Sequence, residues 1–386
     1  MPIGADPMAH ETLLTRALDG VHRHIDRDNT PHSIAAVDAG WIERRLNAAG
    51  HDVTLTGFDA TPLGSGLMGN TYRLALRHVD PAPGTPRSVV FKCTGDSPAS
   101  RQLGKRGFGI AGRPGFYGAE VRFYAQFASD LPIRTPRAYA TWLSDEEDEF
   151  SLLLEDFPDS VAGDEFTGCT RAQAIECMAG LAGLHAPLWN SDLLRDGWLK
   201  PISAELKPVL AGNMARAVAR LKERHQALFT AEDMTVIERF APHYPDWSCA
   251  AGRPAALTHS DYRLDNMLFD GGHSVVLDWQ TFATAHPGRD TGLFLGCSVP
   301  TETRRAVQDE ALGAYHARLC ELGVRDYSYD QCVDDFLFGT FIGLQNVVIG
   351  MNAVLSTDRG TQMFLNKLAR CRATIDDHRA LDRFFA

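Results

Sequence analysis

The hydrophobic pattern of this 386-residue chain changes character near residues 155–158. Before that point, apolar and polar residues alternate over short stretches such as 71–76 and 88–92, which is typical of strands. After it, apolar residues recur at helical spacing over long segments, namely 171–186, 203–229, 304–322, 330–351 and 363–386. Only 261–278 interrupts this second pattern, with short strands at 267–269 and 275–277. The pattern predicts an α+β protein with a small β-rich lobe followed by a larger, mostly helical lobe.

Three regions follow from this change of pattern. Residues 1–50 contain two short amphipathic helices, predicted at 10–25 and 33–49, which we expect to pack on the part that follows. Residues 51–156 form the β-rich lobe, and residues 157–386 form the helical lobe. In the helical lobe we place the catalytic loop (residues 259–266, described below) and the substrate site. Two such lobes would bind a nucleotide in the cleft between them.

Charge and cysteine usage narrow the class of protein. The formal net charge of −11 and a pI near 5.7 argue against a nucleic-acid partner. The eight cysteines are scattered without a C-x-x-C pair, which predicts reduced thiols and neither a disulfide framework nor a zinc site. The first residues, MPIGADPMAHETLL, do not resemble a secretory signal, and no apolar run approaches the ~18 residues of a membrane span. We expect a cytoplasmic protein that binds no membrane; its oligomeric state is left open.

The strongest chemical signal is the pattern H-x-D-x-x-x-x-N at 259–266, followed by Asp278 after the apolar run 275–277. Phosphoryl transfer from a nucleotide needs a carboxylate that accepts the proton of the attacking hydroxyl. It also needs an amide oxygen and a second carboxylate that hold magnesium. The pattern therefore predicts Asp261 as the base, and Asn266 and Asp278 as magnesium ligands.

Other polar residues around this pattern receive structural interpretations. His259 is expected to bond to the backbone. Arg263 and Asp265 are expected to be solvated or paired with each other. Asp290 either orients the catalytic loop or caps a helix N-terminus. His185 is interpreted as the end of a core helix.

A glycine-rich stretch, Gly64-x-Gly66-x-x-Gly69, precedes an alternating segment typical of a strand. A dinucleotide-binding fingerprint would be followed by a helix, whereas a hairpin after the glycines matches a kinase phosphate loop. Without a Cβ, glycine lets backbone N–H groups approach phosphates closely. We predict that nucleotide phosphates bind Gly64, Ser65, Gly66, Gly69 and Asn70; an ordinary glycine hairpin is the alternative.

Lys92 ends an apolar strand some twenty residues after that stretch. A lysine at this position can neutralise the α- and β-phosphates when an acid holds it, and Glu120 on the next predicted helix is the candidate. The alternative is two unrelated surface charges. The intervening segment 95–118, with seven glycines and several basic residues, is predicted to be a loop and receives no role.

Several segments together resemble the aminoglycoside phosphotransferase/choline kinase superfamily: HSDYRLDNMLF, VVLDWQ, LLLEDF and LAGLHAPLW. Within it, E-x-R-F-Y at 120–124 and D-W-Q in place of D-F-G are similar to the CHK-kinase-like (ecdysteroid kinase-like) branch. The resemblance runs from about residue 50 to the C-terminus. It implies a protein-kinase-like bilobal fold, with the same roles for the base, the metal ligands, the lysine and its glutamate.

The resemblance also implies a hinge whose backbone binds the adenine, made of Leu154, Glu155, Asp156 and Phe157. The chain departs from the superfamily in one respect that affects the catalytic loop. It has H-S-D where H-G-D is usual, and a serine is less suited than glycine to a position with positive φ.

Together these patterns predict an ATP- and magnesium-dependent kinase that phosphorylates a hydroxyl of a small molecule, with GTP left open as the donor. Its partners would be the nucleotide and that acceptor. No A-P-E-type activation segment follows Asp278, which argues against protein substrates. Acceptors left open are an aminoglycoside or other antibiotic, and a hydroxyacyl-CoA or sugar. A catalytically silent nucleotide-binding regulatory protein is the alternative from another class; intact Asp261, Asn266, Asp278 and Lys92 argue against it.

Overall fold

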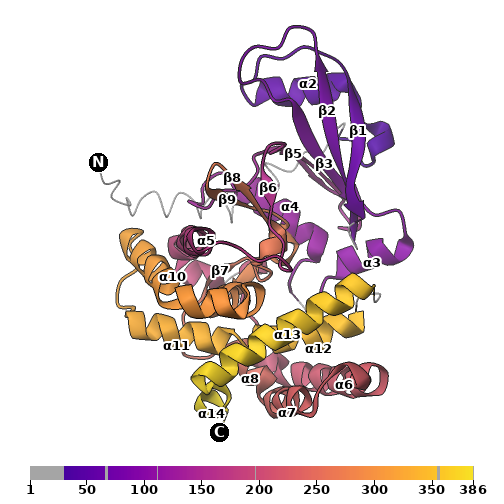
Figure 1. Cartoon of the computed structure of the whole chain (residues 1–386). Helices are drawn as coiled ribbons and strands as arrows, with labels where there is room; N and C mark the ends of the chain where they lie inside the picture. The colour runs from indigo at the N-terminus through magenta and orange to yellow at the C-terminus, as the bar shows by residue number, and fades with distance from the viewer. Residues whose placement is uncertain (1–29, 66–67, 111, 196, 354–356, 386) are drawn as a thin grey trace. The chain divides into compact units, whose positions relative to one another are not determined.

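The computed structural model describes residues 30–65, 68–110, 112–195, 197–353 and 357–385. The chain forms two compact units (Figure 1). The first comprises Met1–Ser160 together with Val275–Phe282, and the second comprises Val161–Ser274 and Ala283–Ala386. The segment Val275–Phe282, which the sequence assigned to the helical lobe, thus folds with the first unit. The predicted helix at 10–25 lies outside the described residues.

The first unit is built on a five-stranded antiparallel sheet with the order β1-β2-β3-β5-β4. The strands are β1 (Leu55–Ser65), β2 (Gly69–His78), β3 (Ser88–Thr94), β4 (Ala138–Leu143) and β5 (Phe150–Glu155). The central strand β3 pairs Lys92 with Thr71 on one side and with Leu152 on the other. This register fixes Lys92 in the middle of the sheet.

A helix covers one face of this sheet, as expected for 33–49. It consists of a 3₁₀ turn η1 (Ile34–Ala36) and α2 (Ala39–Ala48), whose N-cap Asp38 accepts the Trp41 N–H at 2.8 Å. Trp41, Ile42 and Leu46 are buried in one cluster with Leu74 and Phe91 of the sheet. Each fully buried side chain of this size contributes about 1.5–3 kcal/mol.

The prediction of a loop over 95–118 was wrong in part, because α3 (Pro98–Arg106) lies within it. Ser97 caps this helix by accepting the Ser100 N–H at 3.0 Å, and Pro98 occupies the first turn, where its missing N–H costs nothing. Gly107, with φ 55°, ends the helix. The seven glycines therefore include a helix terminus and close packing contacts, and their number alone did not indicate a loop.

Two basic residues of this segment pair with an acidic turn at residues 145–149. Arg101 pairs with Glu149 at 2.5 Å and Lys105 with Glu146 at 3.2 Å. Exposed pairs of this kind contribute about 0–1 kcal/mol each. Two of the four basic residues to which the sequence gave no role are thus paired within the first unit.

The helix α4 (Phe116–Gln126) holds the segment that follows Asp278. Phe123 of α4 stacks on Trp279 with ring centroids 3.6 Å apart and an interplanar angle of 6°, and contacts Phe282 edge-on at 5.0 Å. Trp279 is fully buried and begins the 3₁₀ turn η9 (Trp279–Thr281). This aromatic packing is the reason that 275–282 belongs to the first unit.

The second unit is mostly helical, as predicted. Its helices are α5 (Arg171–His185), α6 (Lys207–His225), α7 (Ala231–Phe240), α8 (Tyr244–Cys249), α9 (Gly288–Leu293), α10 (Thr301–Glu321), α11 (Tyr329–Gly339), α12 (Ile342–Ala353), α13 (Asp358–His378) and α14 (Ala380–Phe384). The remaining strands are β6 (Val161–Ala162), β7 (Ala256–Thr258), β8 (Met267–Asp270), β9 (His273–Val276, which runs into the first unit) and β10 (Ala283–Ala285). Further 3₁₀ turns are η2 (Ala186–Leu188), η3 (Asp192–Arg195), η4 (Gly197–Leu199), η5 (Ala204–Leu206), η6 (Gln226–Leu228), η7 (Ala241–His243) and η8 (Leu264–Asn266), and a π turn is η10 (Phe294–Ser298). Helix α5 lies along α10, and α12 along α13 (Figure 1).

Among the described residues, one helical stretch of this unit is long and apolar. By length and composition, Tyr329–Asn352 could cross a membrane, but 72% of its most apolar part is buried inside the protein, as in a core helix. All eight cysteines are free thiols, which agrees with the prediction of reduced cysteines.

Candidate active site

The catalytic loop of the second unit runs from the end of β7 into the turn η8 and brings Asp261 and Asn266 together. Nδ2 of Asn266 donates to both the carboxylate Oδ2 and the backbone oxygen of Asp261, each at 2.9 Å. The amide NH₂ is thus used within the loop, which turns its Oδ1 away from Asp261. That oxygen is the donor atom a hard cation such as magnesium requires.

Arg263 also bonds to the carboxylate of Asp261, at the same oxygen as Asn266. Its Nε lies 3.1 Å from Asp261 Oδ2, and its Nη1 lies 2.9 Å from Asp265 and 3.2 Å from Glu165. Burial alone would raise the pKa of Asp261, but the positive charges of Arg263, Lys367 and His259 outweigh it and hold that pKa below its usual value. Asp261 is therefore a carboxylate at neutral pH. The expected Arg263–Asp265 pair is present. The ion pair between Arg263 and Asp261 was not predicted from the sequence.

Asp290 anchors the start of the loop. This fully buried carboxylate accepts the N–H groups of His259 and Ser260, each at 2.7 Å, and lies 3.2 Å from Nε2 of His185. Nδ1 of His185 in turn lies 2.7 Å from the hydroxyl of Tyr315. Asp290 lies inside α9, whose N-cap is Pro287, so the orienting interpretation holds and the helix-cap interpretation was wrong.

The serine of H-S-D occupies the conformation that disfavours it. Ser260 has φ 63°, in the left-handed region that costs a non-glycine residue about 1–2 kcal/mol. Its hydroxyl lies 2.9 Å from that of Thr258, and its N–H bonds to Asp290. His259 accepts the Asp261 N–H at 3.2 Å through Nδ1, which is the structural role expected for it. These bonds hold the loop in its strained form.

In the first unit, Lys92 of β3, Glu120 of α4 and Asp278 form one cluster. Nζ of Lys92 lies 2.7 Å from Glu120 Oε1 and 3.0 Å from Asp278 Oδ1. The lysine side chain is 12% exposed and that of Glu120 only 1%. Although burial favours the neutral amine, the charges of Asp278 and Glu120 raise the pKa of Lys92 above its usual value. The predicted lysine–glutamate pair is thus formed, with Asp278 as a third member that the sequence did not place there.

Burial raises the pKa of Glu120 to about 7, because the positive charge of Lys92 only partly offsets the lost hydration. Below that pH the carboxyl takes up a proton and Lys92 loses a charged partner. We therefore expect kcat/KM for the nucleotide to rise about tenfold between pH 6 and pH 8, following the ionised fraction of a single group. Steady-state kinetics at constant ionic strength would measure it.

The matched variant is Glu120→Gln, which keeps the shape and removes the titration. The kcat/KM of this variant should be low and should not change between pH 6 and pH 8. Any titration of the nucleotide itself affects both proteins equally. Since the pKa of Asp261 is lowered, the base adds no limb near pH 7. An unchanged pH profile in the variant would show that Glu120 does not set it.

Asp278 suits a cation ligand by its surroundings. Its side chain is 40% exposed, and Oδ1 accepts from Lys92 and from the Gln280 amide. Like Ser260, it has a left-handed backbone, with φ 62°. The described residues contain no group of three or more His, Cys, Asp or Glu side chains that could hold a metal ion. Asp278 in the first unit and Asn266 in the second each offer a side-chain oxygen of the kind that magnesium takes in sites completed by nucleotide phosphates.

The glycine-rich stretch is the hairpin between β1 and β2, where Ser65 lies opposite Asn70. Gly64 and Ser65 end β1 and Gly69 begins β2, whereas Gly66 lies outside the described residues. A Cβ on Gly69 would lie 2.8 Å from the backbone oxygen of Cys93, so this glycine is required by strand packing. Phosphate binding by this hairpin stays a prediction.

The predicted hinge follows β5. Leu154 and Glu155 still pair with Val90 and Val89 of β3, so they belong to the sheet. The side chain of Asp156 is 3% exposed and bonds to Arg73 Nε at 2.6 Å and to the Ser88 hydroxyl at 2.5 Å. It thus stabilises the sheet. The backbone of Phe157 accepts from the Ser160 hydroxyl at 2.7 Å. Adenine binding by this backbone stays a prediction.

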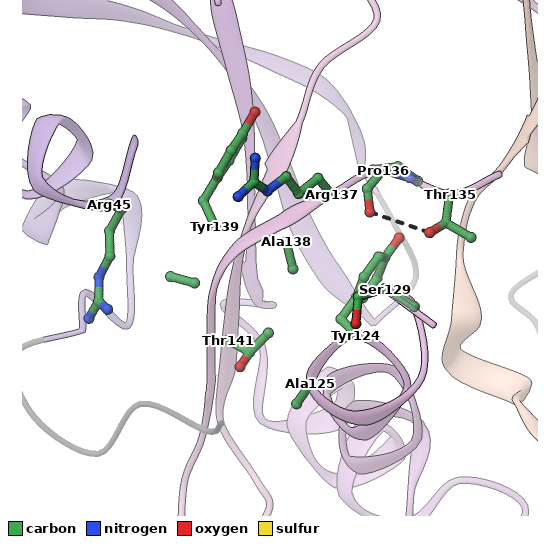
Figure 2. A pocket seen from close by; sticks show the side chains of 12 residues that line it. Arg45, Tyr124, Ala125, Ser129, Thr135, Pro136, Arg137, Ala138, Tyr139 and Thr141 are labelled. Atoms are coloured by element: carbon green, nitrogen blue, oxygen red, sulfur yellow. Dashed lines mark hydrogen bonds between the residues drawn. The ribbon is translucent and has the colours of Figure 1, made fainter. Parts of the chain in front are cut away.

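A pocket of about 580 Å³ opens elsewhere in the first unit (Figure 2). It is lined by Tyr124 and Ala125 of α4, by Tyr139 and Thr141 of β4, and by Arg45 of α2, among others. None of the predicted site residues lines it. We assign it no part in the reaction.

A model of the phosphotransferase enzyme family matches residues 113–328, more than half of the chain. The chain belongs to this family. The matched range includes Glu120, the catalytic loop and Asp278, while Lys92 and α13 lie outside it. The predicted superfamily is thereby confirmed. A search of curated protein sequences finds no match.

Several solved structures are similar to this phosphotransferase. Choline kinase from Cryptosporidium parvum matches 85% of this chain and 93% of its own, with a TM-score of 0.51 and 10% sequence identity. A gentamicin complex of APH(2'')-IIa matches 87% and 96%, with a TM-score of 0.45 and 15% identity. A ternary complex of an APH(4)-Ia mutant with ADP and hygromycin B matches 87% and 98%, with a TM-score of 0.43 and 14% identity. The likeness to choline kinase, together with the antiparallel sheet and the helical second unit, confirms the predicted α+β, protein-kinase-like bilobal fold.

Proposed function

We propose that this phosphotransferase transfers the γ-phosphoryl group of ATP to a hydroxyl of a small molecule in a magnesium-dependent reaction. The observation that carries the proposal is the state of Asp261. Its carboxylate is ionised, its Oδ2 is fixed by Arg263 and Asn266, and its side chain keeps 29% exposure. Among the described residues, Oδ1 has no hydrogen-bond partner and remains for the acceptor hydroxyl.

In the proposed reaction, Oδ1 of Asp261 accepts a hydrogen bond from the acceptor and points the hydroxyl oxygen at the γ-phosphorus. A new P–O bond forms as the bond between the γ-phosphorus and the β–γ bridging oxygen breaks, and ADP leaves with that electron pair. The hydroxyl proton passes to Asp261 and then to solvent. Because the pKa of Asp261 is low, this proton moves late, after the P–O bond has begun to form.

The other groups act on the nucleotide. Lys92, held by Glu120, would neutralise the α- and β-phosphates. Asn266 and Asp278 would hold magnesium, which when bound neutralises charge on the β- and γ-phosphates. The side-chain patterns at 120–124 and 278–280 favour the CHK-kinase-like branch, and ATP is the proposed donor.

The test is ADP release by the full-length protein with magnesium, ATP and a panel of hydroxylated metabolites and antibiotics. Chelation of magnesium by EDTA should lower the rate at least a hundredfold, and restored magnesium should recover it. ATP with magnesium should also raise the melting temperature, since a ligand that binds only the folded state stabilises it. A nucleotide-dependent melting shift without any phosphorylated acceptor would favour the silent binding protein, and absence of both would contradict the proposal.

A further inference from the structure

Helix α13 places a buried lysine beside the catalytic loop. Sδ of Met363 lies 3.5 Å from Nη1 of Arg263, so this face of the helix packs on the loop. Lys367 follows Met363 by four residues and therefore lies on the same face. It is only 3% exposed. Its positive charge also acts on Asp261, as the lowered pKa of that carboxyl records.

Lys367 has no partner of its own. Within the described part of the chain, its Nζ makes no hydrogen bond or ion pair, and Asp261 lies beyond ion-pair distance. Water reaches this Nζ, since it is not one of the fully buried polar atoms that lack a hydrogen bond. An ammonium that has only water as its partner in the free protein is available to bind an anion.

The neighbouring charges already have partners. Arg263 is shared among Asp261, Glu165 and Asp265, and Arg370 donates to the backbone oxygens of Ser298 at 2.6 Å and Glu165 at 2.7 Å. The second oxygen of Glu165, Oε1, is buried without a hydrogen bond, but its carboxylate is in an ion pair with Arg263. Among these charged side chains, only Lys367 lacks a hydrogen-bond or ion-pair partner within the described part of the chain.

We propose that Lys367 binds an anionic group of the acceptor, a carboxylate or a phosphate, close to the hydroxyl that Asp261 activates. The inference rests on the proposed kinase function and names its substrate class: a hydroxy acid or a phosphorylated alcohol. The neighbouring carboxylates of Glu165 and Asp265 each lie in an ion pair with Arg263, whereas Lys367 has no protein partner and can bind a negative charge of the acceptor.

The experiment compares acceptors that share one carbon frame and differ in charge. One set is 3-amino-1,2-propanediol, glycerol, glycerate and glycerol 3-phosphate; a second set is glucosamine, glucose, glucuronate and glucose 6-phosphate. Phosphorylation with magnesium-ATP gives kcat/KM for each. Binding of each compound is measured separately by calorimetry, with magnesium and a non-hydrolysable ATP analogue, so that selectivity is read even without turnover.

In the wild-type protein the anionic members should be preferred at least tenfold over the neutral and cationic ones. The carboxylate and phosphate members show which anion is preferred. Lys367→Met should remove that preference through a rise of at least tenfold in KM, while Lys367→Arg keeps most of it. Lys222→Met is the matched control, since Lys222 is exposed on α6 and pairs with Glu238.

Equal binding and turnover of neutral or cationic members by the wild-type protein would overturn the inference while leaving the kinase function intact. An equal loss of kcat for all acceptors in Lys367→Met would also overturn it, because the lysine would then act on the transferred phosphoryl group or only on Asp261. Lys367-dependent binding of the anions without any phosphorylation would support the anion site and contradict the kinase function.

Discussion

Asp261→Asn is expected to lower kcat by about 10²–10⁴-fold, the usual contribution of a positioned general base. The amide keeps an oxygen that can accept from Asn266 and Arg263, so the loop should stay folded. It cannot accept the proton of the hydroxyl. The measurement is single-turnover kinetics at saturating nucleotide, together with the melting temperature of each protein.

Asp265→Asn is the matched control for this experiment. Asp265 pairs with Arg263 at 2.9 Å and Asp261 pairs with it at 3.1 Å, so each variant removes one carboxylate charge that is paired with the same arginine. Only Asp261→Asn removes the proposed base. We expect less than a tenfold change in kcat for Asp265→Asn. If the two variants lost activity equally, Asp261 would act through Arg263 and the proposed chemistry would be wrong.

Asp290→Ala is expected to destabilise the protein by about 3–5 kcal/mol, the usual result of removing one member of a buried charged network. The backbone N–H groups of His259 and Ser260 and the ring of His185 would lose their shared acceptor inside the core. Urea unfolding, followed by circular dichroism, measures the change.

A graded series strengthens that test. Asp290→Asn keeps one acceptor oxygen, so its free energy of unfolding should lie between those of the wild type and Asp290→Ala. Its kcat should be lower than that of the wild type, because the loop is less well held. Asp330→Ala, an exposed position in the first turn of α11, should change stability by less than about 1 kcal/mol. If Asp290→Ala lowered the free energy of unfolding no more than Asp330→Ala, the buried hydrogen bonds of Asp290 would not be what holds the loop.

Much of the fold could be predicted because its signals are local. The alternation of β3 and β5 and the helical spacing of α5 and α10 come from residues that are neighbours in the chain. The segment at 98–106 could not be predicted from composition, since glycines that end a helix or pack against an aromatic ring look like loop glycines. Gly104 is one of these: a Cβ there would lie 2.0 Å from the ring of Tyr117.

The residues of the candidate site and the Lys92–Glu120 pair could be predicted from the sequence, but the other contacts could not. Lys92 meets Asp278 across 186 positions of sequence. His185 reaches Asp290 across 105 positions. Lys367 carries no motif at all. Such contacts depend on how distant elements pack, and no local pattern encodes them.

The cluster around Lys92 couples the binding of the cation to the binding of the nucleotide. In the free protein, Asp278 is already neutralised by an internal ammonium at 3.0 Å. If Asp278 takes a divalent cation as proposed, the cation shares the charge of this carboxylate with the ammonium, and Lys92 is then held less strongly by Asp278 and binds phosphate more readily. Cation and nucleotide are then linked through this carboxylate, so that each should bind more tightly in the presence of the other.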